Sequence, residues 1–207
     1  MTENQLLTDL KKLAAAGVIR SSLPSFITYK SLTGKSLTGK VFRSYCFKNN
    51  DITEVSKGTF YELHCLILEN IAKCKVVFQP YSHWGSVWAA FGKAIPPVSM
   101  IHAQKFFGEI PCTGEMYLEQ INSNLAAALY EQVKTFYDKS FPYNLNAVLL
   151  DQIGPLLLGV SVEDVIDKAI YFEEAAEIAY KIRNLEGIQY RHMHYALMEK
   201  FYTEDLG

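Results

Sequence analysis

The residues that could carry chemistry lie close to one short turn, where Gln79, Tyr81 and His83 alternate with Pro80 and Ser82. An apolar run precedes this turn at 76–78, and large residues at helical spacing follow it from 84 to 91. A strand that enters a helix through a tight turn is where α/β enzymes often hold their reactive groups. An amide and a phenol form no zinc site, and one imidazole is too few. The turn therefore lies where an α/β enzyme often has its reactive site, but it lacks the residues that would form a metal site there.

Two pairs of residues elsewhere have a chemical and a plainer interpretation. His192 and His194 form an H-x-H pair in a segment expected to be helical, where residues two apart face different ways, so a solvated aromatic face is favoured over a metal site. Asp151 and Gln152 are either polar remnants of a pocket or turn residues. Both alternatives stay open from the sequence alone.

A duplicated loop and a group of aromatic residues are open in the same way. SLTGK occurs at 31–35 and again at 36–40, which predicts a hairpin loop and, less readily, a phosphate-binding glycine turn. Four aromatic residues around the central turn could stack on a ligand, but core packing or a subunit interface is the better interpretation. These four are Tyr81, Trp84, Trp88 and Phe91.

The elements that must position these residues alternate between strand and helix patterns. We expect helices at 6–16, 59–73, 84–91, 102–107, 118–137, 162–185 and 188–202, and strands at 24–30, 41–48, 76–78, 110–112, 147–150 and 156–158. In the helix at 118–137 the inward residues should be Leu118, Ile121, Leu125, Leu129, Val133 and Phe136.

Composition narrows the class of protein. The 207 residues are 49% hydrophobic and 20% charged, which favours a single folded domain spanning 1–207. A net charge of −2 leaves no electrostatic footprint for nucleic acid, and no apolar run is long enough for a membrane span. The start lacks the apolar stretch of a secretion signal. Four scattered cysteines without a CxxC pair indicate reduced thiols and a cytoplasmic protein.

The order of these pieces resembles the class II aldolase/adducin family, of the fuculose-phosphate and ribulose-phosphate aldolase and epimerase type. The matching segments are the early helix, the glycine-loop hairpin, the helix that contains Leu63-His64, and a series of motifs that runs to about residue 185. These motifs are VVF…SVWAAFGKAIPP, GEIPC, EQINSNLAAAL and GPLLLGVSVEDVIDKA. The resemblance implies a three-layer α/β/α fold with a mixed, largely antiparallel sheet.

The resemblance also implies a site, and this sequence departs from it at every position. Working members bind a divalent metal, usually zinc, through three histidines, beside an acidic residue that acts as general acid/base. By spacing, the histidine positions fall on Gln79, Tyr81 and Ile153, and the acid falls on Phe60. The asparagine of the family's phosphate-binding strand falls on Phe26, flanked by Ser25 and Lys30.

We therefore expect a non-catalytic aldolase/adducin-like scaffold, a pseudoenzyme without a metal cofactor, that acts through oligomerisation, a partner or a small ligand. The alternative is an active lyase or isomerase for a sugar phosphate, with zinc or another divalent metal in an altered site. By resemblance, the chain should form a homo-oligomer, with a tetramer as the expected state. The apolar residues at the old site should fill it, so that the pocket is narrower and drier than that of an aldolase.

Overall fold

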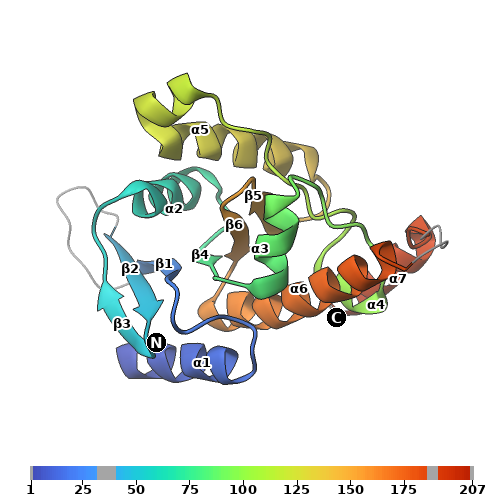
Figure 1. Cartoon of the computed structure of the whole chain (residues 1–207), viewed down its shortest axis with the longest axis horizontal. Helices are drawn as coiled ribbons and strands as arrows, with labels where there is room; N and C mark the ends of the chain where they lie inside the picture. Colours follow the sequence, from blue (N-terminus) through green and yellow to red (C-terminus); the bar gives the residue numbers. More distant parts are fainter. Residues whose placement is uncertain (1, 32–40, 186–190, 206–207) are drawn as a thin grey trace.

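Six strands form one sheet at the centre of the molecule (Figure 1). The computed structural model describes residues 2–31, 41–185 and 191–205. The strand order is β3-β2-β1-β4-β6-β5, and each neighbouring pair of these strands is antiparallel. The strands are β1 (Ser25–Ser31), β2 (Val41–Lys48), β3 (Asp51–Glu54), β4 (Val76–Gln79), β5 (Ala147–Leu150) and β6 (Gly154–Gly159).

Helices cover both faces of the sheet (Figure 1). Helices α2 (Thr59–Asn70) and α5 (Leu118–Lys139) lie on one side, and α1 (Glu3–Ala15) and α6 (Val162–Arg183) lie on the other. The remaining helices are α3 (His83–Ala90), α4 (Met100–Lys105) and α7 (Tyr195–Asp205).

The core is divided in two by the sheet. Successive side chains of a strand point to opposite faces, and β4 shows this clearly. Val76 and Phe78 pack in a cluster with residues of α1, α3 and α6, whereas Val77 packs in a second cluster with residues of α2 and α5. The predicted three-layer α/β/α fold is therefore confirmed. The only parallel pairing in the described ranges is an isolated bridge between Cys112 and Leu149.

Some predicted boundaries were wrong. The expected strand at 110–112 is only a pair of isolated bridges, Ile95 to Ile110 and Cys112 to Leu149. Helix α4 begins at Met100, two residues before the prediction, because the Ser99 hydroxyl caps it by accepting from the His102 N–H at 3.3 Å. Strand β3 was not predicted. Residues 32–40 and 186–190, which carry the predicted hairpin loop and the predicted helix start at 188, lie outside the described residues.

Helix α5 differs from its prediction in which residues it buries. Asn124 interrupts it with non-helical dihedral angles (φ −159°, ψ 92°), and the Asn124 side chain caps the following turn by accepting from the Ala127 N–H. Leu129 and Val133, after the kink, are buried as predicted. Leu118 and Ile121, before it, are exposed by 71% and 46%. The kink reorients the first turns, so the apolar stripe does not continue onto the core.

The cysteine side chains are free thiols in the described residues. All four cysteines are free, and burial raises the pKa of both Cys74 and Cys112 to about 11. These two thiols are therefore protonated at neutral pH. Within the described ranges, no helix combines the length and hydrophobicity needed to cross a membrane.

Candidate functional site

The turn between β4 and α3 is held rigidly from both sides. The Ser82 hydroxyl caps α3 by accepting from the Gly85 N–H at 2.8 Å. The Glu173 carboxylate, from α6, accepts from the N–H groups of His83 and Trp84, each at 3.0 Å, and from the Ser82 hydroxyl. The sequence prediction of a Ser82-capped helix here is confirmed. The buried carboxylate from α6 was not anticipated, because nothing local marks Glu173 as a partner of this turn.

Glu173 is an acid held under the helix N-terminus rather than one aimed at a ligand. Burial raises its pKa, and the hydrogen bonds from Ser82 and from backbone N–H groups oppose this effect. Among the described residues, its hydrogen bonds all come from the first turn of α3 and its N-cap, Ser82. Glu173 is thus a structural capping residue.

Three of the residues singled out by sequence converge at the end of β4. Phe60, in the first turn of α2, packs against Phe26 of β1 with ring centroids 5.5 Å apart. Phe26 is in turn the antiparallel partner of Gln79 on β4. Two aromatic rings and an amide therefore occupy the corner between α2 and strands β1 and β4.

Tyr81 and Ser25 meet at the same corner through the backbone. The Tyr81 N–H donates to the Ser25 hydroxyl at 2.8 Å, and the Tyr81 carbonyl accepts from the Arg20 N–H at 3.1 Å. Ile153 lies in the turn between β5 and β6 and packs, half-buried, against the cluster that contains the α2 core residues. Because β6 pairs antiparallel with β4, its first residues lie beside the end of β4, at the same edge as Gln79.

A buried polar chain lies behind this corner, and sequence reasoning missed it. The Thr28 hydroxyl donates to the Ser44 hydroxyl at 2.7 Å and lies 2.8 Å from His64 Nδ1. His64 Nε2 and Gln79 Oε1 are both buried, and within the described residues neither has a hydrogen-bond partner. Burial lowers the pKa of His64 to about 3, although the nearby Gln79 side chain opposes the shift. The imidazole is therefore neutral. The one sequence clue was a polar residue on the apolar face of α2.

Lys30 does not join the other phosphate-strand residues. It lies at the far end of β1, where its N–H donates to the Lys75 carbonyl at 3.1 Å. At 3.3 Å per residue, five strand positions separate it from Ser25 by about 17 Å. Ser25 and Phe26 belong to the corner at the end of β4, whereas Lys30 belongs to the opposite end of the sheet.

Of the two pairs left open by the sequence, His194 and Gln152 have structural roles. His192 and His194 precede α7 instead of lying on a helix, which corrects the prediction. His194 Nδ1 accepts from the Ala196 N–H at the start of α7. Gln152 adopts φ 56° and its N–H donates to the Ala89 carbonyl, as expected of a turn residue.

The aromatic residues near the turn are mainly packing residues. Trp88 is fully buried and its indole N–H donates to the Ala176 carbonyl at 2.9 Å. Trp84 packs on the Tyr180 ring, with centroids 4.9 Å apart. Phe91 stacks on the same ring but is 52% exposed. Core packing therefore accounts for Trp88, as the sequence favoured, and an apolar edge remains at Phe91.

Sequence comparison decides the family. The profile described as "Class II Aldolase and Adducin N-terminal domain" matches residues 31–180. The chain belongs to this family. The resemblance inferred from motif order is thereby confirmed.

Solved structures of class II aldolases share the fold. An L-fuculose 1-phosphate aldolase superposes with a TM-score of 0.70 at 12% identity, covering 98% of this chain and 94% of that one. The L-fuculose 1-phosphate aldolase from Glaciozyma antarctica PI12 gives 0.72 at 12%, covering 98% and 80%. An aldolase II superfamily protein from Pseudomonas syringae gives 0.67 at 14%, covering 97% and 82%. At such identities the likeness concerns the fold alone.

The residues at the corner do not fit the metal that the class II aldolase family uses. The positions assigned by resemblance carry the amide of Gln79, the phenol of Tyr81 and the alkyl chain of Ile153, which together supply no imidazole, thiolate or carboxylate ligand. The aromatic pair Phe26–Phe60 occupies the corner beside them. Across the described residues, no group of three or more His, Cys, Asp and Glu side chains is arranged to hold a metal ion.

Proposed function

We propose that this chain is a non-catalytic member of the class II aldolase and adducin N-terminal domain family, a cytoplasmic scaffold that works through self-assembly, a partner or a small ligand. The observation that carries the proposal is the contact between Phe60 and Phe26 beside Gln79. A phenyl ring transfers no proton, and an amide is a poor substitute for an imidazole ligand. The group for proton transfer and the imidazole ligands for a metal are then both missing from this corner.

The burial at this corner supports the same proposal. Gln79 is 7% exposed and His64 is fully buried, so neither presents a polar group to solvent. This arrangement is in keeping with a site that has been filled by side chains.

The test combines metal analysis with an activity assay. Purified protein, loaded with zinc and then desalted, should retain no stoichiometric metal by mass spectrometry. It should also cleave L-fuculose 1-phosphate, the substrate named for its structural relatives, no faster than a buffer control. The alternative of an active lyase with an altered metal site predicts the opposite: about one tightly bound ion per chain, and zinc-dependent cleavage that Gln79→Ala abolishes.

A further inference from the structure

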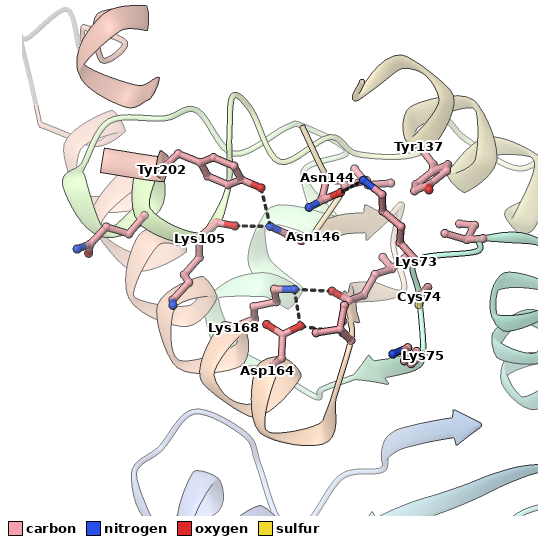
Figure 2. A pocket seen from close by; sticks show the side chains of 16 residues that line it. Lys73, Cys74, Lys75, Lys105, Tyr137, Asn144, Asn146, Asp164, Lys168 and Tyr202 are labelled. Atoms are coloured by element: carbon pink, nitrogen blue, oxygen red, sulfur yellow. Dashed lines mark hydrogen bonds and ion pairs between the residues drawn. The ribbon is translucent and has the colours of Figure 1, made fainter. Parts of the chain in front are cut away.

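We call the corner between α2, β1 and β4, where Phe26, Phe60 and Gln79 meet, the family corner. A cavity at the opposite end of the sheet is rich in lysine. It has a volume of about 530 Å³ and lies between the segment before β4, the end of β6 and the start of α6. Four lysines and one carboxylate are among its lining residues. Figure 2 shows the labelled side chains around it: Lys73, Lys75, Lys105, Lys168 and Asp164.

Part of this positive charge is already balanced. The Lys168 side chain is 8% exposed, and its ammonium donates to Asp164 Oδ2 and to the Leu158 carbonyl, each at 2.9 Å. Asp164 Oδ2 also accepts from the Val160 N–H at 2.9 Å. Lys105 forms an ion pair with Asp167 at 2.9 Å. Asp164, the one carboxylate among the described residues that line the cavity, is thus already paired through Oδ2.

The other two lysines, Lys73 and Lys75, have no carboxylate partner in the part of the chain that the structure describes. Lys73 is exposed, and its ammonium contacts the Asn144 side-chain oxygen at 3.3 Å (Figure 2). Lys75 is also exposed, and among the described residues no carboxylate pairs with either lysine. Lys168 adds no net charge because Asp164 balances it, but its ammonium has three donor hydrogens and only two acceptors among the described residues. Lysines from three separate segments therefore line one cavity, and no described carboxylate balances the charge of Lys73 or Lys75.

The backbone at the end of β6 and the period of helix α6 hold Asp164 and Lys168 in this arrangement. A Cβ at Gly159 would lie 2.6 Å from Asp164 Oδ2, so the end of β6 needs glycine for Asp164 to approach it closely. Lys168 follows Asp164 by four residues on α6 and is therefore on the same helix face. The Lys168 charge is held in place by burial, while Lys73 and Lys75 remain at the mouth.

We propose that this cavity binds the phosphate group of a small organic phosphate. A phosphate monoester carries about two negative charges, which matches the two unbalanced charges of Lys73 and Lys75. The volume is that of a small-molecule pocket, and the net charge of −2 for the chain does not fit a nucleic-acid surface. The Asn144 and Tyr137 side chains on the wall supply polar and aromatic contacts for the organic part. This site is separate from the family corner and does not depend on whether the chain is catalytic.

Amide NMR spectra give the direct test. Inorganic phosphate is titrated into the protein at constant ionic strength, balanced with potassium chloride, and glycerol phosphate is titrated in a second series. We expect saturable shifts that centre on the amides of residues 73–75, 144–146 and 158–160, with glycerol phosphate binding more tightly than phosphate. Absence of saturation in these amides up to tens of millimolar phosphate would overturn the proposal. Weaker binding of glycerol phosphate than of inorganic phosphate would overturn the claim that the cavity also contacts the organic group.

A charge-matched pair of variants provides the control. The double variant Lys73→Ala/Lys75→Ala removes two exposed side chains and should weaken phosphate binding by roughly tenfold or more without changing the melting temperature in phosphate-free buffer. The double variant Lys12→Ala/Lys181→Ala removes the same charge from surfaces outside the cavity and should bind as the parent does. Equal losses in both double variants would mean that phosphate senses only the overall charge, which contradicts a site.

Discussion

At the scale of single residues, Phe60 is the clearest departure from an enzyme. Its ring is half-buried and packs on Phe26, at the position where the family resemblance places an acid. A carboxylate there would lose this aromatic contact, but it would gain from the positive end of α2, because residue 60 is in the first turn. Because these two effects oppose each other, the substitution should change the free energy of unfolding by less than the loss of the aromatic contact alone.

We predict that Phe60→Glu lowers the free energy of unfolding by about 1–2 kcal/mol and produces no lyase activity. Urea denaturation measures the first effect, and an aldol-cleavage assay with added zinc measures the second. The control is Phe141→Glu, whose ring is 85% exposed and which should change stability by less than about 0.5 kcal/mol. A more stable Phe60→Glu protein, or one that gains zinc-dependent cleavage, would contradict the description of this corner.

Two buried histidines make stability depend on pH in a defined direction. Burial lowers the pKa of His64 to about 3 and that of His102 to about 4, whereas the unfolded value is 6.5. Below pH 6.5 the unfolded chain binds protons that the native chain does not, so stability falls as pH falls, down to the folded pKa values.

The expected slope is up to about 1.4 kcal/mol per pH unit for each histidine between pH 6 and their folded pKa values. His64→Leu and His102→Leu should each reduce the slope of unfolding free energy against pH in this range, and the double variant should reduce it most. Urea denaturation at pH 4.5, 5.5 and 6.5 measures these slopes. Unchanged slopes in both single variants would show that neither imidazole is buried in its neutral form.

At the scale of elements, the turn into α3 depends on a close approach of α3 to its neighbours. A Cβ at Gly85 would lie 2.6 Å from the Phe172 ring of α6 and 2.8 Å from the Pro155 ring of β6. Both rings are buried, so they cannot move aside freely. This glycine, together with the Ser82 and Glu173 caps, holds the helix against β6.

We predict that Gly85→Ala destabilises the protein by about 1–3 kcal/mol through overpacking, despite the better helix propensity of alanine. The matched control is Gly114→Ala, because the nearest atom to a Cβ at that position is the Gln132 side-chain oxygen at 3.7 Å. The melting temperatures of both variants, measured by thermal unfolding, test this prediction. A Gly85→Ala protein as stable as the control would show that α3 has room to move.

At the scale of the whole molecule, the two ends of the sheet differ in the polarity and charge of their side chains. The end with Gln79 and Phe60 is closed by aromatic and amide groups, and the end with Lys73 and Lys75 is open and cationic. Large apolar side chains are also exposed, notably those of Leu118 on α5 and of Phe91, which follows α3. An apolar surface of this kind favours association of copies, in keeping with the proposed homo-oligomer.

We predict that the protein forms a homo-oligomer in solution, with a tetramer as the expected state. Light scattering coupled to gel filtration should report about four times the chain mass of 23.5 kDa at micromolar concentration. Leu118→Glu/Ile121→Glu should shift the mass towards smaller species, because charge on an interface core opposes burial. A monomeric parent protein would remove the assembly part of the proposed function.

The sequence by itself determined the family, the three-layer fold class, most helix and strand positions, and the alternation that sends Val76 and Val77 to different core clusters. These properties depend on periodicity and on motif order, which are local or sequential. The kink at Asn124 was missed because a single side-chain cap overrode a regular apolar period.

Only the tertiary structure decided which distant residues share a space. The pairing of β1 with β4 brings Phe26 to Gln79 and, at the other end of the same strands, sends Lys30 to Lys75. An antiparallel register of this kind depends on contacts across the sheet, so residues four apart on one strand can belong to different sites. Likewise, Lys73 and Lys168 become neighbours of one cavity because β6 and α6 pack beside the segment that precedes β4.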